Sequence, residues 1–344
     1  MKKIIYISIA ILSSTFTFAQ QETQLTQFFI NPYLYNPAAG GTSSLIDLNL
    51  GFRQQWTGIQ GAPMTIYGSG TAPVRFGKKG ENVVQSFKPE KTFFSQPEVT
   101  TGIIKHVLGG KFMSTSVGPF NKTSLGVSYA FHFPLVKSIN MSFGVSAGYS
   151  NFGLNTSRVS LYQTEDNAYN TLLSNSGNQN IFDMQAGLFI YNKHFQFGYS
   201  ATQLIQNKLE LSKITTNSNL NMHHFIFATG TFDIGKNLQL SPGIFMSMVK
   251  NAPFNIEGSL RLMYNRMAWF MVGYKNSNTL SLGIGANLFK CMRIGYSFDI
   301  GVSKLRSINN SSHEITLGFI IGKNKVSAPA PVQESSAQPA STKE

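Results

Sequence analysis

The stretch "LIDLNLGFRQQW", residues 45–56, alternates apolar and polar side chains with a period of two. The apolar phase holds Ile46, Leu48, Leu50 and Phe52, and the polar phase holds Asp47, Asn49, Gly51 and Arg53. Successive side chains of a β-strand point to opposite faces. The stretch therefore predicts a strand with one apolar and one polar face, and the same alternation recurs in residues 141–150, 254–264 and 293–301.

Along the rest of the chain, the same period of two predicts a total of fourteen strands. They lie near 45–56, 63–73, 101–112, 122–135, 140–152, 181–191, 194–205, 222–234, 238–249, 254–264, 267–275, 279–288, 291–302 and 312–322. These segments match the roughly 9–11 residues of a tilted transmembrane strand and exceed the 5–6 residues usual in globular proteins. We therefore expect a transmembrane antiparallel β-barrel rather than a secreted β-sandwich or adhesin.

The links between the expected strands alternate in length. Residues 153–180 and 206–221 are long and polar, whereas "KSIN", "NKH", "GKN", "NR" and "FK" are tight turns. Outer-membrane barrels have short periplasmic turns and long outer loops, and an even number of strands places both chain ends in the periplasm. We therefore expect both termini to be periplasmic; the long basic segment 74–100 is the exception among the short turns.

Charged residues inside the expected strands share the Gly/Ser/Asn phase. They are Asp47, Arg53, Asp183, Glu257, Arg261, Arg293 and Asp299. An arginine facing lipid near the bilayer midplane costs about 2–4 kcal/mol. This phase is therefore expected to line the lumen as a mixed-sign, hydrogen-bonded network; the alternative is that these are solvated lumen residues with no specific role.

The N-terminus carries an export signal. "MKK" precedes an apolar run, and Ala19 offers a small residue at the cut, so residues 1–19 are expected to be a secretory signal peptide, with a signal anchor as the alternative. The remaining chain has 26 basic and 15 acidic residues, a net charge of +11. Export argues against a nucleic-acid partner, and a membrane surface or an acidic partner fits better. The single cysteine, Cys291, cannot form an internal disulfide.

The segment before the first strand, residues 20–44, contains "QFFINPYLYNPAAGG" at 27–41. It holds two Asn-Pro pairs, Asn31-Pro32 and Asn36-Pro37. Proline interrupts helices and central strands, and Asn-Pro favours turns. An apolar segment fixed by turns needs a surface to cover it. It is expected either to plug the barrel lumen or to dock a partner.

Several motifs together resemble one family. "QFFINPYLYNPAAGG", "FRQQWTGIQGAP" and "RIGYSFDIGVSKLRSINNSSHEITLGF" follow in order over nearly all of residues 24–322 and are similar to the PorP/SprF family. The family comprises outer-membrane proteins of the type IX secretion system and gliding motility machinery of Bacteroidetes. The resemblance implies export or surface display of a large adhesin with a type IX C-terminal domain, and contact with periplasmic ring components. The long 74–100 link and a Pro/Ala/Ser-rich tail at 327–344, after a barrel at 45–326, depart from that pattern.

Two groups are candidate partner sites. Besides the Asn-Pro pairs, Arg53, Gln54, Gln55 and Trp56 end the first strand beside an outward turn, although Trp56 also suits an interfacial aromatic belt. At the opposite rim, Lys78, Lys79 and Lys88 are candidates for binding an acidic periplasmic protein. Attraction to anionic outer-membrane lipid, worth about 1 kcal/mol per cation, is the alternative.

Catalysis has little support in the sequence. His223 and His224 are adjacent on an expected strand and point to opposite faces, so they cannot share a metal from one side. No HExxH, CxxC or GxSxG spacing occurs. We expect a protein that is not an enzyme and needs no cofactor. A passive or plugged, porin-like channel is the alternative function.

Overall fold

The computed structural model describes residues 24–43, 45–74, 99–159, 178–207, 220–250, 252–289, 291–302 and 311–322. The expected signal peptide, the C-terminal tail and nearly all of the 74–100 link lie outside these residues.

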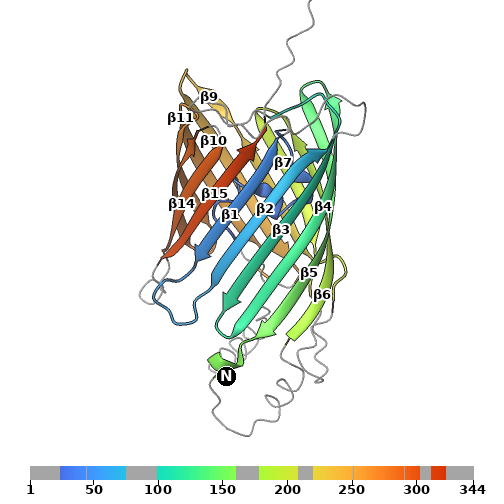
Figure 1. Ribbon diagram of the computed structural model, residues 1–344. Helices are drawn as coiled ribbons and strands as arrows, with labels where there is room; N and C mark the ends of the chain where they lie inside the picture. Colours follow the sequence, from blue (N-terminus) through green and yellow to red (C-terminus); the bar gives the residue numbers. More distant parts are fainter. Residues whose placement is uncertain are drawn as a thin grey trace, which may run out of the picture.

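The described residues form fifteen antiparallel strands around a barrel (Figure 1). The strands are β1 (Ile46–Gln54), β2 (Met64–Val74), β3 (Lys105–Val117), β4 (Phe120–Val136), β5 (Ile139–Leu154), β6 (Asn178–Tyr191), β7 (Phe195–Thr202), β8 (His223–Gly230), β9 (Phe232–Ile234), β10 (Leu238–Val249), β11 (Asn255–Tyr264), β12 (Ala268–Lys275), β13 (Thr279–Leu288), β14 (Met292–Gly301) and β15 (Ser312–Ile321). β1 pairs with both β2 and β15, and β10 pairs with both β8 and β11, so the sheet closes on itself.

β8 and β9 occupy one position in this barrel. Only Thr231 separates them, and both pair with β10. The barrel thus has fourteen strand positions, and the predicted fold is confirmed. The predicted strand 101–112 was misplaced, because β3 runs from Lys105 to Val117. The turn that ends it is Gly118-Pro119, where Gly118 has a φ of +57° that favours glycine.

The two faces of the sheet differ as the alternation predicts. Leu50 and Val127 are 49% and 68% exposed on the outer surface, whereas Asn49 and Thr65 are buried on the lumen side. Large apolar side chains exposed this widely are unusual in soluble monomers and form the lipid-facing band of a membrane barrel.

The barrel has two distinct ends. One end, here the long-link end, carries the links 55–63, 118–119, 155–177, 203–222, 250–254, 276–278 and 302–311. The opposite, short-turn end carries the turns 137–138, 192–194, 235–237, 265–267 and 289–291 and the long link 75–104. A short 3-10 helix, η3 (Thr156–Arg158), follows β5 at the long-link end. In the described part of the chain, no helix is long and apolar enough to cross a membrane.

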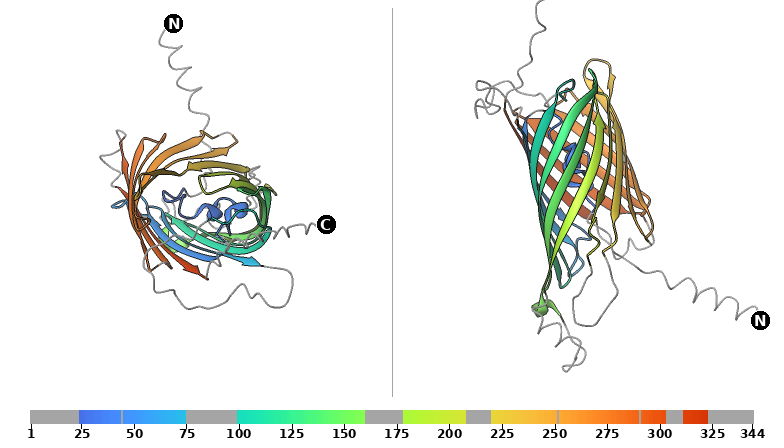
Figure 2. Two further views of the ribbon diagram at one scale, coloured as in Figure 1. Left: turned by 90° about the horizontal axis from the view of Figure 1, so that it is seen from above. Right: turned by 90° about the vertical axis from the view of Figure 1, so that its right-hand side faces the viewer.

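Residues 24–43, here the plug segment, lie inside the lumen (Figure 2). The segment contains two 3-10 helices, η1 (Pro32–Leu34) and η2 (Pro37–Ala39). Thr26 contacts residues near the long-link end, whereas Gly40 and Gly41 approach Thr71 and Val107 near the short-turn end. The plug segment therefore runs along the lumen before β1 begins.

Candidate functional site

Each Asn-Pro pair starts one 3-10 helix of the plug segment. Pro32 and Pro37 occupy the first helical position, where a missing N–H costs least. The Asn36 side chain accepts a hydrogen bond from Ala38 N at 2.9 Å, and its Nδ2 donates to the carbonyls of Leu188 and Tyr199. Asn31 makes no such cap and instead donates from Nδ2 to Ser69 Oγ at 2.8 Å. Both asparagines therefore fix the plug segment to the barrel wall.

Glycines in the wall make room for the second of these helices. A Cβ on Gly187 would lie 2.0 Å from Asn36 Oδ1, and a Cβ on Gly144 would lie 2.4 Å from Ala38 N. Glycine inside a strand often marks such a close approach of another backbone. β5 and β6 are therefore shaped to hold η2.

Apolar side chains fill much of the lumen around the plug segment. Phe28 and Tyr35 pack on Phe245, with ring centroids 5.1 and 4.8 Å away. Phe29 meets Trp269 edge-on at 5.4 Å. The lumen is thus partly an aromatic core, and the plug segment supplies one side of it.

An ion cluster surrounds the first residues of the plug segment. It consists of Arg53, Glu257, Lys275, Asp299 and Glu314, all buried. Arg53 Nη2 lies 2.7 Å from Asp299 Oδ2, and Nη1 lies 3.0 Å from Glu314 Oε2. Lys275 Nζ lies 3.3 Å from Asp299 and 3.7 Å from Glu257. Three carboxylates thus face two cations at the long-link end.

The plug segment completes this cluster. Backbone N–H groups of Thr26 and Gln27 donate to the two oxygens of Glu314, at 2.8 and 3.2 Å. Thr26 Oγ1 donates to Asp299 at 2.7 Å and accepts from Arg53 and Lys275 at 2.9 Å each. These charge-assisted bonds are stronger than neutral ones and fix the segment in register with β1, β12, β14 and β15.

Sequence reasoning missed Glu314 and Lys275. Glu314 shares the polar phase of "SHEITLG" with Ser312 and Thr316, the same signal that marks the other lumen charges. Lys275 lies on the same phase of β12 as Trp269 and Met271. Because these two residues are apolar, the lumen-facing phase of this strand does not stand out as polar in the sequence. Those apolar residues face the lumen because the plug segment covers them.

The remaining expected lumen residues fall into separate groups rather than one network. Arg293 Nη2 contacts Asp47 Oδ1 at 2.6 Å and Asn49 Oδ1 at 2.9 Å. Asp183 accepts from Gln203 N at 2.8 Å. The Arg261 guanidinium lies 4.8 Å from the centre of the Phe29 ring. Arg261, Arg293 and Asp47 line one cavity beside the plug segment, whereas Asp183 lines another.

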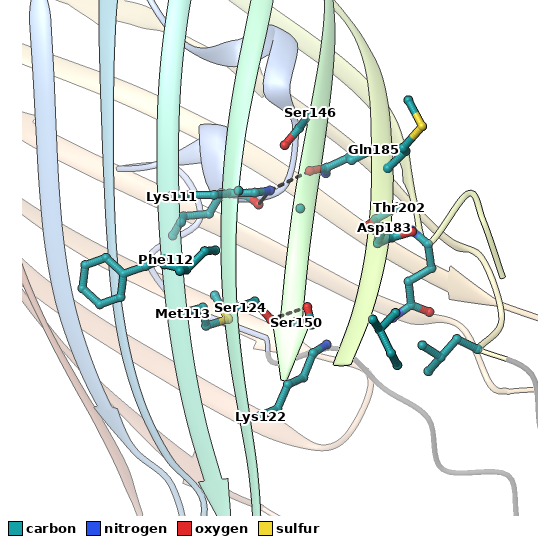
Figure 3. A pocket seen from close by; sticks show the side chains of 18 of the residues that line it. Lys111, Phe112, Met113, Lys122, Ser124, Ser146, Ser150, Asp183, Gln185 and Thr202 are labelled. Carbon is teal, nitrogen blue, oxygen red and sulfur yellow. Dashed lines mark hydrogen bonds between the residues drawn. The ribbon is translucent and has the colours of Figure 1, made fainter. Parts of the chain in front are cut away.

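A cavity of about 140 Å³ opens beside the plug segment near the long-link end (Figure 3). Small hydroxyl side chains of β4 and β5 form one wall, where Ser124 and Ser150 share a hydrogen bond at 2.8 Å. Lys111 donates to Gln185 Oε1 at 2.6 Å and to the Leu34 carbonyl at 3.0 Å. Gln185 also donates from Nε2 to the Tyr35 carbonyl. The plug segment narrows the lumen here without filling it.

The sequence of this barrel matches one known protein family over most of its length. The sequence model described as type IX secretion system membrane protein PorP/SprF matches residues 17–319, nearly the whole chain. The chain belongs to the PorP/SprF family. This PorP/SprF protein is therefore a membrane component of the type IX secretion system, located in the outer membrane, and it works with other components of that system.

Solved outer-membrane barrels resemble this PorP/SprF protein only in general shape. The toluene transporter TbuX of Ralstonia pickettii is 9% identical, covers 85% of this chain and 93% of its own, and gives a TM-score of 0.47. The Pseudomonas putida toluene transporter TodX is 8% identical, with coverages of 84% and 93% and a TM-score of 0.42. Omp33 of Acinetobacter baumannii is 9% identical, with coverages of 80% and 99% and a TM-score of 0.40. No curated protein matches the sequence.

The expected partner sites lie in different environments. Arg53 is not available at the rim, because it is only 3% exposed and paired inside the ion cluster. Asn31, Asn36 and Pro37 are buried against the barrel wall, and Pro32 lies half-buried between them.

The rim of the PorP/SprF barrel keeps other candidates accessible. Gln54 and Gln55 are half-buried at the long-link end, and Trp56 is 43% exposed there. Lys78, Lys79 and Lys88 lie outside the described residues, so their role stays a prediction. Within the described ranges, no group of three His, Cys, Asp or Glu residues could hold a metal ion.

Proposed function

We propose that this PorP/SprF protein supports the export or surface display of a large adhesin that carries a type IX C-terminal domain. The family match over residues 17–319 carries this proposal. In this role the protein binds and positions partners and performs no reaction. The accessible Gln54–Trp56 rim at the long-link end is the proposed contact for the adhesin domain. Ring components would meet the short-turn end.

The filled lumen argues against passage of the adhesin through the barrel. The plug segment occupies the lumen with buried aromatic and ion-paired contacts. A folded or extended adhesin would have to displace those contacts to pass through. We therefore propose that the adhesin binds the barrel without passing through its lumen. A passive, porin-like channel is the competing function, and ion conductance by the parent protein separates the two.

The test combines gene deletion with site-specific crosslinking in cells. Deletion should remove the adhesin from the surface and leave it in the periplasm, and the intact gene should restore display. A photo-crosslinking residue at Thr57, exposed beside Trp56, should capture the adhesin C-terminal domain. The matched position Ser138, exposed in a turn at the other end, should not. Normal display in the deletion strain would refute the proposal.

A further inference from the structure

A second cavity lies on the other side of the plug segment, near the short-turn end. Its volume is about 170 Å³, and Arg261 and Arg293 both line it. Its walls also carry hydroxyl and amide side chains, from Ser69, Thr71, Gln196, Thr229 and Thr231. Such groups can donate hydrogen bonds to an anion.

Two arginines but only one acid are found among the described residues that line the cavity. Arg293 pairs with Asp47 at 2.6 Å, and Asp47 is the one carboxylate among the described residues that line the cavity. Arg261 has no ion-pair partner in the described part of the chain, and its guanidinium stacks over Phe29 at 4.8 Å. The Nε atoms of both arginines are buried without a hydrogen-bond partner among the described residues. The cavity thus has one cation in excess.

The charge balance of this cavity is opposite to that of the ion cluster at the long-link end. At the long-link end every cation of the cluster contacts a carboxylate directly, and acids outnumber bases by three to two. In the cavity near the short-turn end, two arginines face one carboxylate. The Arg293 and Asp47 side chains keep 17% and 27% of their surface accessible, so solutes can reach the pair. A buried or half-buried charge without a partner is costly, and a bound counter-ion removes that cost.

We propose that this cavity is an oxyanion-binding site in which Arg261 is the principal ligand. Guanidinium groups bind carboxylate and phosphate through parallel hydrogen bonds, and the contact with the Phe29 ring fixes the position of this guanidinium. The ligand is a carboxylate or a phosphate. Its source is either an acidic side chain of a protein that docks at the short-turn end or a free anion.

Isothermal titration of the purified full-length barrel in detergent tests this site. The probes are inorganic phosphate and a tetraglutamate peptide, each titrated at constant ionic strength in chloride. We expect saturable binding of at least one probe, weakened about tenfold or more by Arg261→Gln. Lys122→Gln is the matched control, because it removes a lumen-facing cation that lines the cavity at the opposite end. It should leave binding unchanged.

The outcomes separate the sources of the anion. Tighter binding of the peptide indicates an acidic polypeptide partner, and binding of phosphate alone indicates a free oxyanion. If Arg261→Gln fails to assemble, Arg261→Lys is the second variant. It keeps the positive charge near Phe29 but loses the planar guanidinium that donates two parallel hydrogen bonds, so binding should still weaken. Absence of binding by either probe, or equal binding by the parent and both Arg261 variants, overturns the proposal.

Discussion

At the residue scale, Arg53 is the side chain on which the plugged state depends most directly. It bridges Asp299 and Glu314 and donates to Thr26, so it joins three strands to the plug segment. Without it, three buried carboxylates would face only Lys275. Like charges that close together repel, and a single lysine would leave two of the three negative charges uncompensated.

Arg53→Met should therefore lower the free energy of unfolding by about 3–5 kcal/mol, the range for removing one partner of a buried pair. The measurement is urea unfolding of the barrel in detergent. Glu314→Gln should also destabilise, but the double variant should lose less than the sum of the two single losses. Strict additivity would mean that the 3.0 Å contact contributes nothing.

At the element scale, the plug segment and the barrel wall are matched to each other. η2 lies against Gly144 and Gly187, where any side chain would collide with the plug backbone or with Asn36. The strand pairs of β5 with β4 and β6 do not depend on this contact. Displacing η2 should therefore open the lumen and leave the sheet intact.

Gly144→Leu and Gly187→Val should both produce ion conductance in planar bilayers, because a fourteen-strand barrel without its plug can hold a water-filled pore. The parent should conduct little. Gly126→Ala is the matched control, since its Cβ would lie 3.4 Å from the nearest atom. Unchanged conductance in assembled Gly144 and Gly187 variants would show that the plug segment does not close the lumen.

At the scale of the whole molecule, the direction of the barrel in the membrane decides which partner meets which end. The short turns, the end of β15 and the oxyanion cavity share one end. Thr26, by contrast, lies near the long-link end, because the plug segment runs along the lumen before β1. The described chain therefore starts near the end opposite to the one where β1 begins. The last strand, β15, does end at the short-turn end.

Cysteine labelling in whole cells tests the direction of the barrel. In a Cys291→Ser background, Ser277→Cys, exposed in the 276–278 link, should react with a membrane-impermeant maleimide. Ser138→Cys, exposed in the 137–138 turn, should react only after the outer membrane is broken. The opposite pattern would place the short turns outside.

The barrel fold could be predicted from the amino-acid sequence alone. A period of two, strands of membrane-spanning length and charges confined to one phase follow from local side-chain placement against lipid and water, and they predict fourteen strands and their faces. The resemblance in ordered motifs also identified the family, as the match over residues 17–319 confirms.

The contents of the lumen, by contrast, depend on contacts between residues far apart in the sequence. The pairing of Arg53 with Glu314 joins residues 261 positions apart, and no local pattern encodes that contact. Trp269 and Met271 break the alternation because an apolar plug, rather than water, lies against them. Arg293 and Arg261 both lie on the polar phase of their strands, so the alternation does not distinguish them. In the folded barrel, Arg293 pairs with Asp47, whereas Arg261 lies over Phe29 of the plug segment and contacts no described carboxylate.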